Sequence, residues 1–180
     1  MQFIPTQIDG VFIMEVERKE DARGFFARIF ARDEMRERGL EDEFPQHNVG
    51  YNHQKGTLRG MHFQRAPHAE TKLVRCTQGR VIDVALDIRP DSPTFRRWVA
   101  VELSAENHRM LYIAVGCAHG YQTLEDDTEL SYLTSQVYVP KSATGFRHDD
   151  PAFAIEWPLP VSVISDADRN WADFSPDLLR

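Results

Sequence analysis

The amino-acid sequence predicts an all-β fold, in the form of a sandwich, a jelly roll or a barrel, with one or a few short helices. Three observations support this prediction. Apolar and polar residues alternate with a period of two from residue 71 onward, turn residues separate many short apolar segments, and only one segment has helix signals at both ends. The 180 residues, 42% of them hydrophobic, suffice to bury one sizeable core. We therefore expect a single domain spanning residues 1–180.

The clearest alternation runs from Ile82 to Ile88, where aliphatic residues occupy the even positions and two aspartates and an alanine occupy the odd ones. This period of two is typical of a β-strand. The preceding segment, 71–77, is joined to this strand through residues 78–80, a short link of the hairpin type that contains Gly79. We expect the two strands to be antiparallel neighbours.

Seven further segments have the same short, strand-like character and are separated by Gly, Pro, Asp and Asn. They are residues 11–17, 25–30, 57–63, 95–103, 109–113, 121–124 and 128–132. One short helix is expected after Asp33, which can cap it, with Gly39 as the C-terminal stop. The tail from Asp149 to Pro160 is rich in Pro and aromatic residues, and we expect it to wrap the barrel together with the polar stretch from Ser162.

Charge and cysteine content restrict the partners and the compartment. The net charge of −7 and the pI near 5.5 disfavour binding to nucleic acid or to anionic membranes, so a phosphate-bearing ligand requires a local basic cluster. The N-terminal segment lacks signal-peptide features, and no apolar run is long enough to span a bilayer. Cys76 and Cys117 lie among apolar neighbours, as buried thiols do. We expect a cytoplasmic protein.

Two basic residues lie on one predicted strand, within Gly56–Gln64. Arg59 and His62 are three positions apart, which places their side chains on opposite faces unless Gly60 introduces a β-bulge. Lys72 shares a strand face with apolar residues. Its ammonium either extends to solvent from an apolar stem or lies in a site with an anionic or carbonyl partner.

His119 lies in a Gly-flanked turn that leads into a strand, and with His62 it suggests a metal-binding barrel. The segment around His62 reads HFQ, however, without a second histidine two positions later or a following glutamate, which disfavours a metal site. Tyr132 and Tyr138 are compatible with either a packing role or a chemical one. Asp168, taken singly, is compatible with a structural carboxylate in a turn. Because no nucleophile elbow or Gly-rich phosphate loop is present, proton transfer is the chemistry that best matches these side chains.

Eight motifs in order extend over most of the chain: DARGFF (21–26), QHN (46–48), GTLRGMHFQ (56–64), KLVR (72–75), DVALDIRPDSPTF (83–95), LSAEN (103–107), AHG (118–120) and WP (157–158). As a set, the sequence resembles the dTDP-4-dehydrorhamnose 3,5-epimerase family. The resemblance implies a cupin-like jelly roll, a homodimer, and a cofactor-independent isomerase of dTDP-rhamnose synthesis. Its implied substrate is a dTDP-4-keto-6-deoxyhexose, which is epimerised at C3 and C5 by removing a proton and returning it to the opposite face.

The resemblance also implies roles for individual residues. His62 is the general base, Asp168 orients its imidazole, and Tyr132 is the acid on the opposite sugar face. Lys72 stabilises the enolate oxygen. Seven further residues are implied to contact the substrate: Arg23, Arg28, Gln46, Asn48, Arg59, His119 and Tyr138. If the N-terminal strand is exchanged between subunits, Arg23 reaches the partner's site.

Three positions depart from the family pattern, which usually has Glu where this chain has Arg28, Glu where it has Ala143, and Lys where it has Ala167. All three are expected in the nucleotide-binding part of the pocket. Several alternatives therefore stay open. The enzyme acts at C3 only or C5 only, or on another nucleotide-linked 4-keto sugar; or the chain is a noncatalytic sugar-nucleotide binding barrel or a metal-dependent cupin enzyme.

Overall fold

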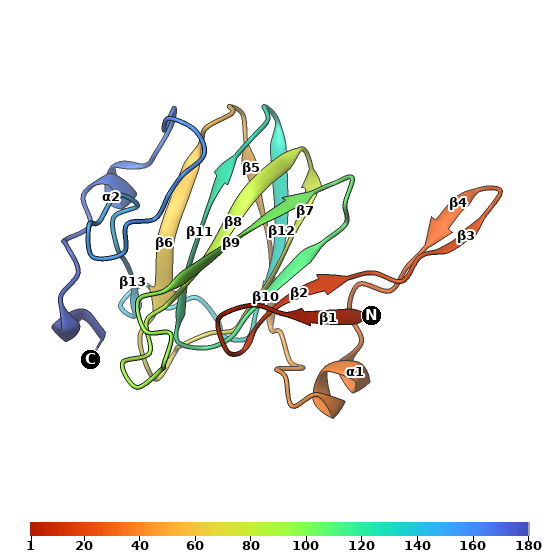
Figure 1. The fold of residues 1–180 in the computed structure, drawn as a ribbon, viewed down its shortest axis with the longest axis horizontal. Helices are drawn as coiled ribbons and strands as arrows, with labels where there is room; N and C mark the ends of the chain where they lie inside the picture. The colour runs from red at the N-terminus through yellow and green to blue at the C-terminus, as the bar shows by residue number, and fades with distance from the viewer. Residues whose placement is uncertain (180) are drawn as a thin grey trace.

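The computed structural model describes residues 1–179 as two antiparallel β-sheets packed face to face, which confirms the all-β, jelly-roll prediction (Figure 1). The first sheet has the strand order β1 (Gln2–Pro5), β2 (Val11–Glu15), β10 (Met110–Ile113), β7 (Lys72–Gln78), β12 (Thr128–Thr134) and β5 (Gln46–Asn52). The second has the order β13 (Ala143–Gly145), β6 (Leu58–Gln64), β11 (Cys117–Thr123), β8 (Arg80–Asp87) and β9 (Trp98–Ser104).

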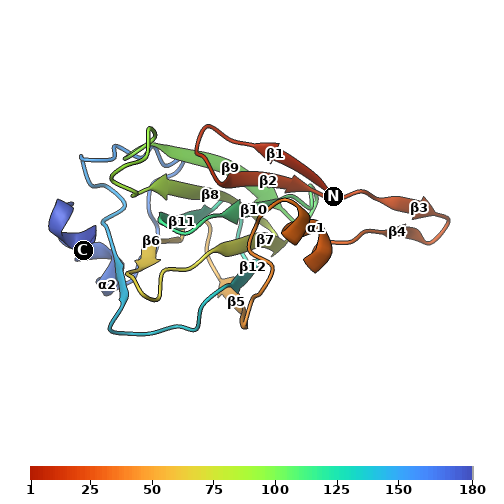
Figure 2. The same cartoon turned by 90° about the horizontal axis from the view of Figure 1, so that it is seen from below.

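Outside the two sheets lie a hairpin and three short helical segments: β3 (Lys19–Asp21), β4 (Gly24–Phe26), α1 (Arg32–Glu37), α2 (Asp166–Arg169) and the 3₁₀-helix η1 (Pro176–Leu179). The hairpin extends away from the sheets, at the end of the molecule opposite to α2 and the C-terminus (Figures 1 and 2). Among residues 1–179, none of the helices combines the length and apolar character needed to cross a bilayer.

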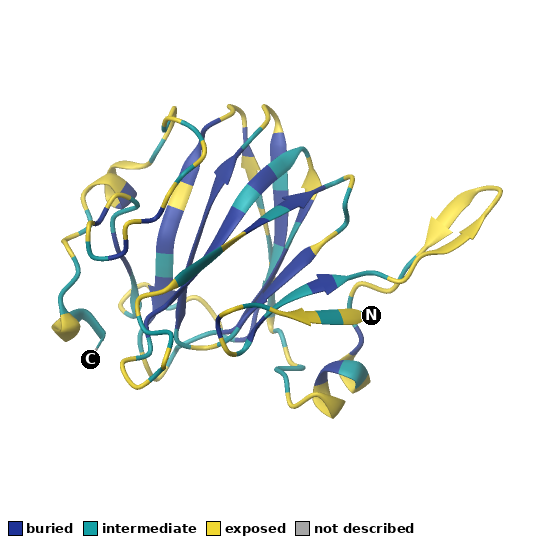
Figure 3. Cartoon of the chain, in the orientation of Figure 1, coloured by how far each residue is buried: buried dark blue, intermediate teal, exposed yellow. Residues whose placement is uncertain are grey.

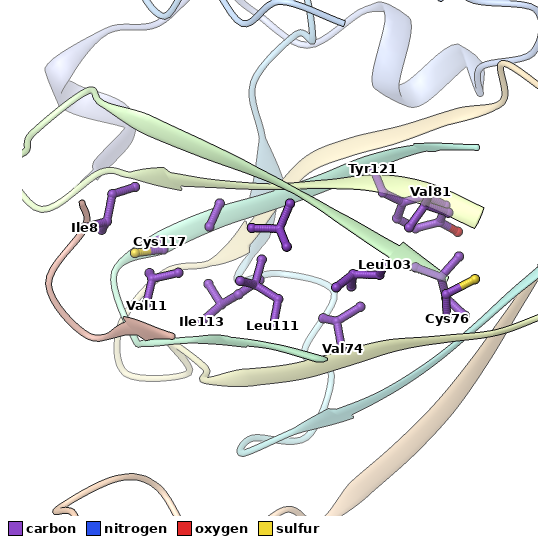
Figure 4. Close-up of a cluster of buried hydrophobic side chains, with 13 residues drawn as sticks. Ile8, Val11, Val74, Cys76, Val81, Leu103, Leu111, Ile113, Cys117 and Tyr121 are labelled. Carbon is purple, nitrogen blue, oxygen red and sulfur yellow. The ribbon is translucent and has the colours of Figure 1, made fainter. Parts of the chain in front are cut away.

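The main core lies between the sheets, where side chains from both inner faces meet (Figure 4). Val74 and Leu111 of the first sheet and Leu103 of the second are among its fully buried members. A second cluster covers the outer face of the five-stranded sheet, where Phe146 and Phe153 of the C-terminal tail pack on even-numbered residues of β8. The tail thus wraps the sheet, as the sequence predicted, and leaves both faces of β8 buried (Figure 3).

The predicted hairpin between β7 and β8 is wrong. β7 pairs with β10 and β12 in one sheet, whereas β8 pairs with β11 and β9 in the other, so residues 78–80 cross between the sheets. Gly79 has a φ of +74°, and a β-carbon there would collide with Thr128. Because β8 is apolar on one face and carries Val81 and Ala85 on the other, it is stable only between the core and the tail.

Three smaller expectations also require correction. Asp33 lies inside the first turn of α1, and the N-cap is Ala31, which provides no side-chain hydrogen bond; the stop at Gly39 is confirmed by its φ of +68°. The strand expected over residues 25–30 is shorter and begins earlier in the structure: β4 spans Gly24–Phe26, is exposed and pairs only with β3. β11 begins at Cys117, so His119 lies within a strand and not in a turn.

A buried carboxylate organises the connection between β8 and β9, and it explains why residues 95 and 96 form a turn and not the start of a strand. Asp87 is fully buried and accepts hydrogen bonds from the Arg89 guanidinium at 2.8 and 2.9 Å, Ser92 Oγ at 2.5 Å and Thr94 Oγ1 at 2.7 Å. Burial alone would raise the pKa of Asp87, but the hydrogen bonds from Arg89, Ser92 and Thr94 outweigh it and lower the pKa to about 2.

This network predicts a pH-dependent contribution to stability. Replacing Asp87 by Asn should lower the free energy of unfolding at pH 7 by about 3 kcal/mol, because Arg89 loses its charged partner. A carboxylate with a depressed folded-state pKa stabilises the fold above its unfolded pKa near 4, and this stabilisation is lost as the pH falls toward about 2. Urea unfolding of both proteins should therefore show a large difference at pH 7 that shrinks between pH 4 and 2.

Asp91→Asn is the matched control, since Asp91 lies in the same connection but is exposed. Its unfolding curve should coincide with that of the wild type. A difference between wild type and Asp87→Asn that stays constant down to pH 2 would contradict the proposed linkage.

Candidate active site

A cavity of about 700 Å³ opens at one end of the jelly roll and is lined by residues of both sheets and of the C-terminal segment. The structure brings seven of the eleven residues proposed from sequence to its wall: Gln46, Asn48, His62, Lys72, Tyr132, Tyr138 and Asp168. They come from β5, β6, β7, β12, the segment after β12, and α2. Residues that are far apart in the sequence therefore share one cavity.

His62 and Asp168 form a hydrogen-bonded pair, with 2.6 Å between Nε2 and Oδ1. The carboxylate is buried and also accepts bonds from the Gly60 N–H and the Trp171 indole N–H, both at 3.3 Å. Burial raises the pKa of Asp168, but the His62 hydrogen bond and charge, with smaller contributions from Gly60 and Trp171, outweigh it and leave the pKa below its usual value. The ionised carboxylate thus holds the proton on Nε2, which makes Nδ1 the basic ring nitrogen.

The local backbone places both partners of this pair. Ser165 caps α2 by accepting a hydrogen bond from the Asp168 N–H at 3.1 Å, so the carboxylate is held in the first turn of the helix. On β6, Gly60 has a φ of +131°, and a β-carbon there would lie 2.5 Å from the Cα of Gly120. Only glycine satisfies both requirements at position 60.

The bulge suspected at Gly60 is present. The register of β6 against β11 shifts so that His62 pairs with His119 and Arg59 pairs with Tyr121. Tyr121 belongs to the core between the sheets, so its face of β11 points inward and so do the cross-strand partners Arg59 and His62. The irregularity therefore places two residues at odd spacing on the same face.

Tyr132 lines the cavity from β12, in the sheet opposite to β6. Burial raises the pKa of its phenol, a nearby Arg59 guanidinium partly lowers it, and the Glu70 carboxylate raises it further. The phenol therefore stays protonated at neutral pH and can donate a proton.

Lys72 lies at the start of β7, on the same inward face as Val74 and Cys76. Its side chain is only 11% exposed, and Nζ lies 3.1 Å from Glu70 Oε1. Of the two readings that the sequence left open, the structure supports a buried site residue with an anionic partner.

Four proposed substrate residues lie outside the cavity wall. Arg23 and Arg28 are exposed, in the β3–β4 turn and after β4, and Arg23 pairs with Asp21 at 2.6 Å. His119 is buried and bonds Asp83 at 2.6 Å between Nε2 and Oδ1, one strand away from His62. Arg59 donates from Nε to Asn52 Oδ1 at 2.9 Å.

Sequence reasoning missed several residues of the wall, among them Gln64, Glu70 and Trp171. Glu70 precedes Lys72 by two positions in a loop, and nothing in its local pattern distinguishes it from a solvated acid. The alanines at 143 and 167, noted as departures from the family pattern, do line the cavity. Within residues 1–179, no three His, Cys, Asp or Glu side chains are grouped so that they could hold a metal ion.

Comparisons with known proteins identify the family of this chain. Residues 5–176 match the family model described as dTDP-4-dehydrorhamnose 3,5-epimerase. The dTDP-4-dehydrorhamnose 3,5-epimerase of Shigella flexneri is 44% identical over 175 residues, which cover 97% of this chain and 96% of that protein.

Two solved structures with bound sugar nucleotides are similar to this one. The dTDP-6-deoxy-D-glucose-3,5-epimerase of Legionella pneumophila, in complex with dTDP-4-keto-L-rhamnose, has a TM-score of 0.88 and 41% identity, with 94% of this chain and 90% of that chain covered. A 3′-monoepimerase of Streptomyces bikiniensis, in complex with dTDP-quinovose, has a TM-score of 0.86 and 33% identity, with 94% and 86% covered. A match that extends over nearly the whole sequence confirms the resemblance carried by the eight motifs, and the chain belongs to the dTDP-4-dehydrorhamnose 3,5-epimerase family.

Proposed function

We propose that this protein epimerises a dTDP-linked 4-keto-6-deoxyhexose at C3 and C5, converting dTDP-4-dehydro-6-deoxyglucose to dTDP-4-dehydrorhamnose. The observation that carries the proposal is the 2.6 Å contact between His62 and Asp168, at the wall of a cavity that Lys72 and Tyr132 also line. Family membership and the ligand-bound relatives support the nucleotide-linked substrate.

The proposed chemistry is a proton removal followed by a proton return. Nδ1 of His62 takes the proton from a carbon next to the C4 ketone, and the electrons of that C–H bond move into an enolate whose oxygen is stabilised by the Lys72 ammonium. Tyr132 then donates its phenolic proton to the opposite face of the same carbon. Solvent protonates the phenolate and deprotonates the imidazolium. Because the ketone itself acidifies the neighbouring C–H bonds, we expect no cofactor.

A second candidate function is epimerisation at one carbon only. The similarity to a 3′-monoepimerase at 33% identity favours this alternative, and so do the two alanines, 143 and 167, at the cavity wall where the family usually has charged residues. Smaller uncharged side chains leave more room beside the nucleotide and fewer charged partners for it. The same two alanines also favour a substrate with a different nucleotide. If the protein binds a sugar nucleotide but exchanges none of its protons, it is the noncatalytic binding barrel.

We further propose a homodimer in which the β3–β4 hairpin of one subunit reaches the other. The residues of both hairpin strands are exposed, and Phe26 in β4 is 65% exposed. Arg23 lies in the turn of this hairpin, which extends away from β6 and α2, the elements that carry His62 and Asp168 (Figure 1), and its guanidinium suits an anion-binding role in a partner's site. On the outer face of β5, Val49 is 63% exposed and gives such a hairpin an apolar surface to contact.

We also propose that the chain forms one domain and that it is located in the cytoplasm. A family match over residues 5–176 supports one epimerase domain across 1–180. The free, buried thiols of Cys76 and Cys117 support a reducing, cytoplasmic location.

Removing the base should abolish exchange. With dTDP-4-keto-6-deoxyglucose in D₂O, the wild type should exchange the protons at C3 and C5, which NMR detects as loss of both signals. His62→Asn should lower the exchange rate at least 10²-fold, because the amide nitrogen of asparagine is not basic and cannot accept the proton. His53→Asn, on an exposed histidine, is the control and should exchange normally. Exchange at C3 alone by the wild type would replace the double epimerase by the single-carbon alternative.

Removing the acid should separate exchange from inversion. Tyr132→Phe keeps the His62–Asp168 pair, so it should still exchange C–H protons on one face, whereas formation of the inverted sugar should fall about 10²-fold. Chromatography of the products, run beside the NMR assay, measures both rates. Tyr51→Phe is the control, since the Tyr51 hydroxyl bonds Asp127 at 2.7 Å, outside the cavity. Equal losses of exchange and inversion in Tyr132→Phe would argue against its role as the acid.

Removing the apolar side chains of the hairpin should dissociate the dimer. Light scattering of the wild type should give twice the 20.8 kDa chain mass, and the double variant Phe25→Ser, Phe26→Ser should move toward the monomer at micromolar concentration. Val163→Ser removes an exposed side chain outside the hairpin and should remain dimeric. A monomeric wild type would refute the dimer.

A further inference from the structure

One carboxylate at the cavity wall has no part in the proposed proton transfers. Glu70 lies in the loop between β6 and β7, and its side chain is only 10% exposed. Its two oxygens have different partners: Oε1 lies 3.1 Å from Lys72 Nζ, and Oε2 accepts a hydrogen bond from Gln64 Nε2 at 2.8 Å. Glu70 thus joins a residue of the five-stranded sheet to a residue of the six-stranded sheet at the cavity wall.

The Gln64 amide is itself fixed, which makes it a rigid support for Glu70. Its Oε1 accepts from the Val139 N–H at 2.7 Å, and its Nε2 also faces the carbonyls of His68 at 3.1 Å and Val137 at 3.2 Å. These contacts establish which end of the amide is the nitrogen, so Gln64 presents a donor to Glu70.

Position 70 therefore lies between two donors, the Gln64 amide nitrogen and the Lys72 ammonium. A carboxylate accepts from both at once, whereas a glutamine would direct its own NH₂ group against one of them. The side chain of Lys72 is nearly buried, so without this partner its charge would be left uncompensated. An ammonium has three N–H donors, and in the described residues only the Glu70 contact is formed by Nζ, which leaves donors for a substrate oxygen.

We propose that Glu70 is a positioning residue for Lys72, anchoring the ammonium at the cavity wall so that its remaining N–H groups meet the enolate oxygen. This inference rests on the proposed epimerase function. The flexible four-carbon stem of lysine would otherwise have to be ordered in each turnover, and a small misplacement of a group that stabilises a transition state is costly.

Glu70 also acts on the acid at long range. Burial raises the pKa of Tyr132, the Arg59 guanidinium partly lowers it, and the negative charge of Glu70 raises it further. Removing the charge should therefore shift the pH at which the acid is lost, which a purely structural role would not do.

Glu70→Gln tests the inference, because it preserves size and removes the charge and one acceptor. Its kcat should fall about tenfold with KM changed less than about twofold, because the effect lies on the enolate and not on substrate binding. The alkaline limb of its kcat–pH profile should move to lower pH. Glu70→Asp retains the charge and should restore the position of the alkaline limb while recovering only part of kcat.

A double-mutant cycle separates positioning from stability. Lys72→Met removes the anchored group, so adding Glu70→Gln to it should change kcat by less than about twofold. Glu15→Gln, which breaks the exposed ion pair with Arg109, is the matched control and should match the wild type. An alkaline limb that does not move in Glu70→Gln would overturn the inference. So would a double variant whose loss of kcat equals the product of the losses in the two single variants. A wild type that exchanges no proton would overturn the proposed function and this inference together, whereas an active wild type equal to Glu70→Gln would overturn the inference alone.

Discussion

The hydrogen bond between His62 and Asp168 is the interaction on which the site depends, and it joins residues 106 positions apart in the sequence. It forms only because the C-terminal tail packs against the outer face of the five-stranded sheet. Phe146 is fully buried there, and Gly145 leaves no room for a β-carbon beside Trp171, whose indole in turn donates to Asp168. Burying the apolar tail therefore also sets the position of the carboxylate that orients the base.

A second constraint is the close approach of β6 and β11 at Gly60 and Gly120. The bulge there lets Arg59 and His62 share the inward face, although regular alternation would separate them. It also directs the Gly60 N–H toward Asp168, so the same irregularity that turns the histidine inward supplies a hydrogen bond to its partner. Gly60 thus contributes both to the inward direction of His62 and to the hydrogen bonding of its partner Asp168.

Charge in the cavity is arranged in pairs. His62 faces Asp168 and Lys72 faces Glu70, both within hydrogen-bond or ion-pair distance, in a chain whose net charge is −7. Pairing permits a lysine to be nearly buried and still remain available to a developing negative charge.

Local sequence patterns predicted the all-β class and most strand positions, and the resemblance to the family predicted seven residues of the cavity wall. The strands are predictable because a period of two and a turn glycine are readable within a few residues, whereas the wall residues were assigned only by their match to the family pattern. The folded arrangement alone places β7 and β8 in different sheets, His119 in a strand beside Asp83, and Glu70 in contact with Lys72 and Gln64. The physical reason is that strand partners and buried charge pairs are selected by which apolar faces are covered, and at β8 both faces are covered by segments distant in the chain.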